Sequence, residues 1–369
     1  MKILVVTLHR VWNWGSVLQT YATQEIFKKY SDKVIIADYI QSRFRKKNVY
    51  LSYPERYGGG GKLKKWLYRI IMFPMRVRLD YIFTKFLKNY INLTKMKFYT
   101  SEQLKMICSD YDILVTGSDQ VWNSQYNGEI DQALFLAFAN ATNICISYAA
   151  SFGMNNIPEK EKEETKRLLE RYNHISVRER DGKEILSDIG IDSTCVLDPT
   201  LVLDQNYWEK FAGKRRIKEK YLLLYALHGC NEGVLKLVKN ISKKMNLKVV
   251  SMNYGWKSLR NQHFDQYISP KSPEDFVSLI GNAEFVVADS FHGIAFSINF
   301  YKNFIAVAPD KYDSRLRSIV TVLGIQDRIY DDSMSIENAL KPMDYKEIEK
   351  KLQYEREKSF KYIEEALYE

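Results

Sequence analysis

Short apolar runs that alternate with longer segments of helical spacing constrain this chain more than any other feature. Residues 2–8 (KILVVTL) and 34–40 (VIIADYI) are typical of buried strands, and residues 12–30 between them place apolar side chains three and four residues apart. Further short apolar runs follow between residues 112 and 198, each ending in a small, polar or proline-containing turn. Such runs suit a parallel sheet that is covered on both faces. We therefore predict an α/β unit in the first half of the chain.

The same alternation begins again after a seam near residues 198–218. The runs YLLLYAL, LKVVSMN, EFVVADS and NFIAVAP are separated by helix-like segments, and a length of 369 residues suits two domains. We predict an N-terminal α/β domain over residues 1–200 and a C-terminal α/β domain over residues 201–345. Glu and Lys at offsets of three and four predict an amphipathic helix over residues 346–369.

A strongly basic segment lies within the first unit. Residues 43–97 hold 15 Lys or Arg but only Glu55 and Asp80 as acidic residues, in a chain of net charge +10. Apolar and basic residues are mixed there at helical spacing, which predicts a basic helical insert over residues 43–100. Three interpretations stay open: attraction to a lipid-linked acceptor or an anionic membrane, contact with nucleic acid, and a solvated face on core helices. No recognised nucleic-acid module accompanies the segment, so we expect no nucleic-acid partner.

Several classes of protein are not favoured by the sequence. The apolar start of the chain is too short for a signal peptide before His9, and no apolar stretch approaches about 18 residues without a charge. We expect a cytoplasmic protein. The basic insert would allow it to contact the inner face of the membrane peripherally. The histidines lack metal-ligand spacing and no nucleotide-binding glycine motif occurs, so no metal and no cofactor are expected.

The segment DSFHGIAFSI places a histidine where a strand is expected to run into a helix. The preceding EFVVA is strand-like, and Asp289 or Ser290 can cap the helix that follows. His292 and Gly293 then lie in the first turn, where unpaired N–H groups and the helix dipole favour an anion. A histidine at this point can donate a hydrogen bond to that anion or move a proton near neutral pH. The alternative is a histidine that only fills the turn.

Arg178 follows another apolar run, HISVRERDG, in the same way. Its guanidinium can hold a carboxylate or phosphate through two parallel hydrogen bonds, which makes Arg178 a candidate anion-binding residue. The alternative is a surface arginine paired with Glu179 or Asp181.

Two further turns in the first half supply candidates for binding a sugar. In GSDQVWN, Asp119 could act as a general base or orient a hydroxyl group, and Trp122 could stack on a sugar ring. In WNWGSVLQ, Asn13 and Gly15 follow the first strand and are expected at the same edge of the sheet. The alternative for Asp119 and Trp122 is a helix cap and a core side chain.

Six motifs in one order resemble the polysaccharide pyruvyltransferase family, from the first strand to about residue 325: WNWGSVLQTYA, GSDQVWN, ISYAASFG, ISVRERDG, VLDPTLVLD and VVADSFHGIAFSI. The resemblance implies two Rossmann-like domains that face each other across a cleft, as in GT-B glycosyltransferases. It further implies an acceptor side in the N-terminal domain and a donor side in the C-terminal domain. The implied reaction transfers the pyruvyl unit of phosphoenolpyruvate to two hydroxyls of one sugar, giving a cyclic ketal and free phosphate. The sugar would belong to a cell-surface polysaccharide, such as a capsule or exopolysaccharide, or to its lipid-linked precursor.

The resemblance also implies roles for individual residues. The family's histidine falls on His292, as proton donor or phosphate contact, and its donor-binding arginine falls on Arg178. Many members carry an arginine where this chain has Ser290. Donor binding is therefore expected to rely in addition on the helix start at Ser290 and Gly293 and on Arg315 or Arg317.

On the acceptor side, Asp119 is expected to be the base that activates a sugar hydroxyl. The residues expected to contact the acceptor are Asn13, Gly15, Ser118 and Trp122. Phosphoenolpyruvate enters as a substrate, so the implied enzyme has no cofactor.

Two other functions are compatible with the pattern. A glycosyltransferase of the same architecture would use a nucleotide sugar, although SFHGIAFSINFYKN offers no carboxylate to grip a ribose. A glycan-binding protein without activity would use its aromatic residues only for stacking, and its discriminating property is the lack of phosphate release.

Overall fold

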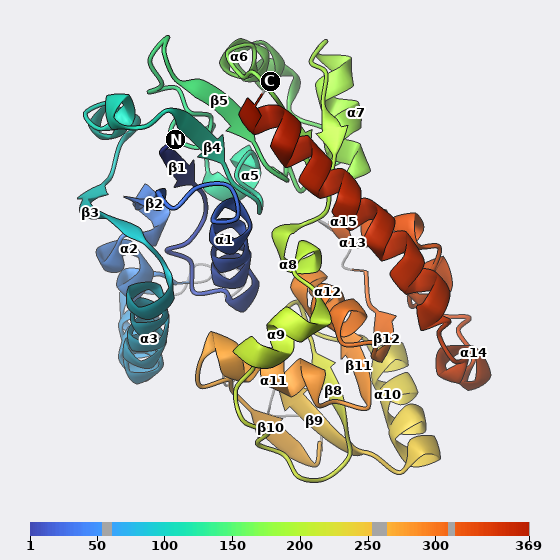
Figure 1. The fold of residues 1–369 in the computed structure, drawn as a ribbon. Coiled ribbons are helices and arrows are strands. Elements are labelled where there is room, and N and C mark those ends of the chain that lie inside the picture. The colour runs from blue at the N-terminus through green and yellow to red at the C-terminus, as the bar shows by residue number, and fades with distance from the viewer. Residues whose placement is uncertain (54–60, 253–263, 309–313, 369) are drawn as a thin grey trace.

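The computed structural model describes residues 1–53, 61–252, 264–308 and 314–368 of the chain. These residues build two five-stranded parallel sheets with helices on both faces of each (Figure 1). The first sheet has the order β3-β2-β1-β4-β5, and the second has the equivalent order β10-β9-β8-β11-β12. The prediction of a parallel α/β fold in two similar units is confirmed. Because all strands run in one direction, the turns at their carboxyl ends gather at one edge of each sheet.

The strands of the first half coincide with the short apolar runs of the sequence. They are β1 (Ile3–Val6), β2 (Val34–Tyr39), β3 (Leu93–Phe98), β4 (Ile113–Thr116) and β5 (Ile144–Ser147), with β6 (Ser176–Val177) and β7 (Thr194–Cys195) as a separate pair. The helices are α1 (Trp14–Phe27), α2 (Lys46–Leu51), α3 (Lys62–Tyr90), α4 (Ser101–Leu104), α5 (Ser124–Asn127), α6 (Glu159–Leu169) and α7 (Arg180–Asp188). All four residues of β1 are buried, since the sheet is covered on both sides.

The basic segment differs from the all-helical insert that the spacing predicted. It contains α2 and the long helix α3, but its last part is β3, which pairs in parallel with β2 at the edge of the first sheet. Lys95 and Lys97 lie on this edge strand, where charged side chains protect the open hydrogen-bonding groups from other strands. The segment is thus the crossover between two neighbouring strands, with an unusually long helix. Residues 54–60 of the predicted insert lie outside the described part of the chain.

The second half repeats this plan. After α8 (Pro199–Val202) and α9 (Gln205–Phe211), its strands are β8 (Tyr221–Tyr225), β9 (Lys248–Met252), β10 (Gln266–Ile268), β11 (Phe285–Ala288) and β12 (Asn303–Ala306). The helices between and after them are α10 (Glu232–Met245), α11 (Pro273–Gly281), α12 (Phe291–Asn299), α13 (Ser314–Leu323), α14 (Ile336–Leu340) and α15 (Tyr345–Tyr368).

The two halves are joined by helix packing and by the last helix. The Trp14 ring of α1 stacks on Phe276 of α11, with 6.2 Å between the ring centroids. Helix α15 lies across both halves (Figure 1). Its Tyr362 hydroxyl donates to the carbonyl of Ser147 at 2.7 Å, and its Arg356 Nε donates to the carbonyl of Leu201 at 2.9 Å. These contacts fix how the carboxyl edges of the two sheets approach each other.

Among the described residues, no helix combines the length and the apolar character needed to cross a membrane.

Candidate active site

The carboxyl edges of the two sheets meet where α1 begins in the first half and α12 begins in the second. Asn13 caps α1, with its side-chain oxygen accepting from the backbone N–H of Gly15 at 2.9 Å and of Ser16 at 3.3 Å. A Cβ atom on Gly15 would lie 2.0 Å from Nδ1 of His292, so only glycine lets the ring approach α1 this closely. The first and last motifs of the sequence are therefore in direct contact.

Asp119 follows β4 and projects its carboxylate into this junction. Its φ of 78° is in the left-handed region, which side chains other than glycine rarely adopt and which costs about 1 kcal/mol or more. The carboxylate accepts from Ser16 Oγ at 2.5 Å and from the backbone N–H of Gln120 at 2.9 Å. Burial would raise the pKa of Asp119, but the charge of Arg178, with smaller contributions from His292 and Arg315, outweighs it and lowers the pKa. Asp119 is therefore charged at neutral pH.

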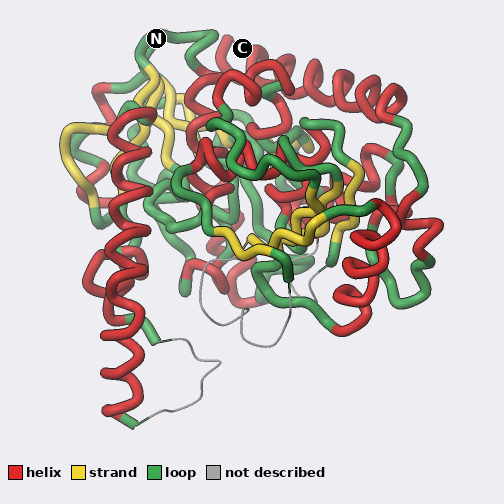
Figure 2. Tube along the Cα trace, turned by 90° about the horizontal axis from the view of Figure 1, so that it is seen from below, coloured by secondary structure: helices red, strands yellow, loops and turns green. Residues whose placement is uncertain are grey.

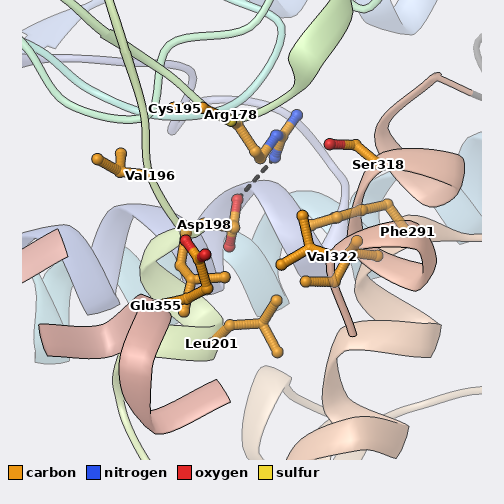
Figure 3. Close-up of a pocket in the computed structure, with 11 residues that line it drawn as sticks. Arg178, Cys195, Val196, Asp198, Leu201, Phe291, Ser318, Val322 and Glu355 are labelled. Carbon is orange, nitrogen blue, oxygen red and sulfur yellow. Dashed lines mark hydrogen bonds and ion pairs between the residues drawn. The ribbon is translucent and has the colours of Figure 1, made fainter. Parts of the chain in front are cut away.

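Arg178 follows β6 and forms a buried ion pair with Asp198. Its Nη1 donates to Asp198 Oδ2 at 2.7 Å, its Nη2 lies 3.6 Å from Asp119 Oδ1, and its guanidinium stacks on the Phe291 ring at 4.7 Å. The alternative of a surface arginine does not hold, since Arg178 is only 6% exposed. Figure 3 shows Arg178 and Asp198 facing each other beside a cavity of about 20 Å³, which Phe291 and Val322 line from the second half. A cavity of this size holds about one water molecule.

Asp198 is a site residue that our sequence analysis did not single out. Its carboxylate caps α8 by accepting from Thr200 N at 2.9 Å, and it also accepts from Ser118 Oγ at 3.0 Å. Burial acts to raise its pKa, but Arg178 and His292 lower it to about 2. The signal was present, because Asp198 follows an apolar run and precedes Pro199, as expected for the cap of a helix at a strand end.

His292 lies in the first turn of α12, as the sequence predicted, and reaches towards the first half. Its Nε2 is 3.9 Å from Asp198 Oδ2, and this nitrogen has no hydrogen-bond partner among the described residues. Burial is the main cause that lowers its pKa to about 4, so the imidazole is neutral. A neutral ring with one free nitrogen can accept a proton or, in the other tautomer, donate a hydrogen bond.

Arg315 enters from the start of α13 in the second half. Its Nη1 is 3.9 Å from Asp119 Oδ1, and burial together with the charge of Arg178 lowers its pKa. Within the part of the chain that the structure describes, Arg315 Nε, Arg178 Nε and Arg178 Nη2 have no hydrogen-bond partner. Buried donors without partners are rare and costly in proteins. Together with His292 they make a set of donors suited to an anion.

Other predicted site residues lie close by but use their polar groups internally. Ser118 is fully buried, with its hydroxyl bonded to Asp198. Ser290 is the N-cap of α12 and accepts from the backbone N–H of Gly293 at 3.4 Å. Gly293 packs against β8, where an added Cβ atom would lie 3.0 Å from the Tyr225 ring.

Two predicted residues lie apart from the junction. Trp122 is only 2% exposed and its ring packs between Phe135 and Phe152, with Nε1 donating to the carbonyl of Leu134 at 3.2 Å. The prediction that it stacks on a sugar is therefore wrong, because its faces are already covered by core side chains. Arg317 is exposed and lies two residues beyond Arg315 on α13, which points it to another side of the helix.

The wall of the site in the first half includes two residues without a sequence signal of their own. The Arg43 guanidinium lies 4.2 Å above the Tyr126 ring. Burial raises the pKa of Tyr126 to about 12, with Asp119 as the second cause, which places this ring within the field of the site. Across the described residues, no three His, Cys, Asp or Glu side chains are grouped as metal ligands.

Comparisons with known proteins bear on the family and on the fold. The family model for polysaccharide pyruvyl transferase matches residues 13–311 of the chain. A search of curated proteins found no match.

Solved structures show the fold. A UDP-N-acetylglucosamine 2-epimerase is 12% identical, with a TM-score of 0.57 over 100% of this chain and 95% of that one. A putative UDP-N-acetylglucosamine 2-epimerase from Listeria monocytogenes is 12% identical, with a TM-score of 0.52 over 98% of this chain and 90% of that one. These similarities confirm the GT-B-type arrangement of two Rossmann-like domains, and at this identity they carry the fold alone.

Proposed function

We propose, from the premise that this chain belongs to the polysaccharide pyruvyl transferase family, that its donor is phosphoenolpyruvate and its product a cyclic pyruvyl ketal. Membership of the family makes the chain a transferase that acts on a polysaccharide. The donor, the ketal and the residues assigned below are our proposal. We further propose that the reaction takes place in the cytoplasm, on a cell-surface polysaccharide or its lipid-linked precursor.

The observation that carries this proposal is the set of buried donors without partners at the junction of the two halves. Phosphoenolpyruvate has a phosphate and a carboxylate, and both are acceptors that guanidinium groups bind in pairs. Arg178 and Arg315 approach from opposite halves and flank Asp119 at 3.6 Å and 3.9 Å. This arrangement lets Arg315 supply the cation that many members of the family carry at the position of Ser290.

The proposed chemistry begins at the donor's double bond. A proton adds to the methylene carbon, and positive charge develops on the carbon that carries the phosphate. The oxygen of one sugar hydroxyl bonds to this carbon and its proton passes to a base. A second hydroxyl of the same sugar then bonds there as the carbon–phosphate oxygen bond breaks, and phosphate leaves with that electron pair. The methyl carbon has gained one proton and the two hydroxyls have each lost one, and the remaining proton passes to the leaving phosphate, so the sum is ketal and hydrogen phosphate.

Asp119 and His292 are assigned to the proton transfers. Asp119 is charged and lies in the first half, so we assign it as the base for the acceptor hydroxyl. His292 is neutral in the absence of donor, with a pKa of about 4. A bound anion raises the pKa of a neighbouring imidazole, because it stabilises the imidazolium. Donor binding would thus convert His292 into the acid that contacts the phosphate and protonates the donor.

The test is phosphate release from phosphoenolpyruvate by the full chain, screened with free and lipid-linked galactosyl, glucosyl and mannosyl acceptors. We expect release that depends on one acceptor and falls roughly 100-fold to 10,000-fold in His292→Gln. His174→Gln is the matched control, because His174 lies before β6, at the end of this strand that is opposite to Arg178. Turnover of nucleotide sugars without any turnover of phosphoenolpyruvate would favour a conventional glycosyltransferase and overturn the proposal. Glycan binding without turnover of either donor would leave a binding protein.

A further inference from the structure

Helix α3 exposes a continuous apolar stripe that begins at its start and covers about two thirds of its length. Leu63, Trp66, Leu67, Ile70, Phe73, Val77 and Tyr81 form this apolar stripe, and each is between 43% and 70% exposed. They recur mainly at spacings of three or four residues, which places them on one face of the helix. From Leu63 to Tyr81 the stripe is about 27 Å long. Isolated exposed apolar residues are ordinary, but a contiguous row of this size marks an interaction surface.

The opposite face of α3 anchors the helix to the molecule. Leu79 and Phe83 enter the core of the first half. Further towards the start of the helix, buried Arg76 donates to the carbonyls of Tyr50 and Ser52 and so holds the end of α2 against α3. Figure 2 shows the start of this long helix, next to the grey trace, extending away from the body. The apolar stripe is thus presented by a fixed element on its outer side.

The charges beside the apolar stripe select its partner. Lys62, Lys64 and Arg78 flank the apolar stripe and are exposed, while the nearby carboxylate of Asp80 is already paired with Lys46 at 2.7 Å. A second copy of this helix would bring cations against cations, which is unfavourable. An anionic lipid surface offers both apolar depth for the stripe and negative headgroups for its flanks. We propose that α3 docks this protein on an anionic lipid bilayer.

The docking surface is connected to the candidate active site. Phe73 on the apolar stripe lies edge-on to Tyr50, with 5.7 Å between the ring centroids, and Tyr50 lies edge-on to Trp12 at 5.9 Å. Trp12 directly precedes Asn13, the cap of α1 at the site. A bilayer held at α3 would present membrane-bound acceptors along this row of aromatic rings. This part of the inference rests on the proposed function and selects the lipid-linked precursor as the acceptor.

The experiment is flotation of the full chain with phosphatidylcholine vesicles that contain or lack phosphatidylglycerol, at low and high salt. We expect binding only to the anionic vesicles, weakening as salt rises. The variant Trp66→Ser/Ile70→Ser should bind roughly tenfold more weakly for each side chain lost. Both side chains are about half exposed, so the fold should be retained, as checked by circular dichroism. The control variant Met106→Ser/Tyr354→Ser removes two large side chains elsewhere that are even more exposed, at 70% and 67%.

Each outcome decides the inference. No flotation with anionic vesicles, or flotation that the Trp66→Ser/Ile70→Ser change leaves intact, would overturn it. A dimer of the wild type that this variant converts to a monomer, without vesicle binding, would assign the apolar stripe to a second copy. Phosphate release with a soluble acceptor should be equal in wild type and variant. If neither turns over phosphoenolpyruvate but flotation behaves as expected, the docking surface stands and the proposed function fails.

Discussion

Asp119 and Asp289 follow corresponding strands of the two sheets, Asp119 three residues and Asp289 one residue after the strand end, yet their carboxylates have different partners. Each follows the strand that neighbours the central strand, β4 in the first half and β11 in the second. Asp289 accepts from the backbone N–H groups of Leu227 and His228, both at 2.7 Å, and its Oδ2 lies 3.3 Å from Nδ1 of the His228 ring. Asp119 instead faces the guanidinium groups of Arg178 and Arg315, which have unused donors. The sheet topology therefore brings each aspartate to the carboxyl edge of its sheet. The groups that contact the carboxylate decide whether it stabilises the fold or is free to take part in a reaction.

The largest effect on turnover is expected when Asp119 loses its charge. Asp119→Asn removes the negative charge that the proposed base needs, so turnover of phosphoenolpyruvate should fall roughly 100-fold to 10,000-fold. The amide keeps the size of the side chain and can still accept from Ser16. Steady-state phosphate release, with donor binding measured separately by calorimetry, checks this prediction. Turnover at the wild-type rate would remove Asp119 from the proposed mechanism.

A second prediction concerns His292, which is neutral in the second half while Asp119 is charged in the first. It states how the stability of the folded chain depends on pH. The pKa of His292 is about 4 in the folded chain against a usual 6.5, so the unfolded chain takes up this proton more readily. Stability linked to the neutral ring is complete above pH 6.5 and is lost as pH falls towards 4, by up to about 3 kcal/mol. Urea unfolding across this window should show a flatter pH profile for His292→Gln. Parallel profiles for both proteins would contradict the assignment of a neutral buried ring.

Asp289→Asn tests the other side of the comparison. The amide can satisfy only one of the two backbone N–H groups that Asp289 now binds, so unfolding should require about 1–3 kcal/mol less free energy. The shift of the urea midpoint, multiplied by the slope of the unfolding free energy with urea concentration, gives this difference. Turnover by the folded variant should stay close to that of the wild type, in contrast to Asp119→Asn. A loss of turnover with unchanged stability would show that the two aspartates are not divided in this way.

The smallest expected effect concerns the contact that brings the halves together. Gly15→Ala places a methyl group where the His292 ring now lies, so the ring must shift and turnover should fall about tenfold. Gly61→Ala is the matched control, because a Cβ atom there meets nothing within 4 Å. An unchanged rate in Gly15→Ala would mean that the ring position seen here is not the one used in the reaction.

Local signals in the sequence predicted most of the fold. The alternation of apolar runs and helical spacing predicted two parallel α/β units. Of the two residues expected to cap the helix after EFVVA, Ser290 is the cap of α12 and accepts from the backbone N–H of Gly293. The strand β3 was not predicted, because its alternating Lys and apolar residues lie at the end of a basic helical pattern. Its role as an edge strand depends on β2, which a local pattern does not reveal.

The candidate site was predictable only in part, for a physical reason. Polar residues at strand ends pointed to His292, Arg178 and Asp119, and the structure brings these three together. Trp122 follows a strand end equally well, but whether an aromatic ring faces solvent or the core is decided by tertiary packing. The approach of His292 to Gly15 likewise has no local signal, since it joins residues from two separate sheets.

The position of α15 has a consequence for the order in which the protein matures. A ribosome releases Ser147 and Leu197 long before it releases Ser359 and Tyr362, which bind them from α15. Domains generally fold as units during synthesis, beginning with the N-terminal one. Until α15 is released, the carbonyl of Ser147 and the N–H of Leu197 therefore lack these partners. The apolar surface that α15 covers also stays exposed. Release of α15 from the ribosome thereby becomes the step that locks the two halves into register.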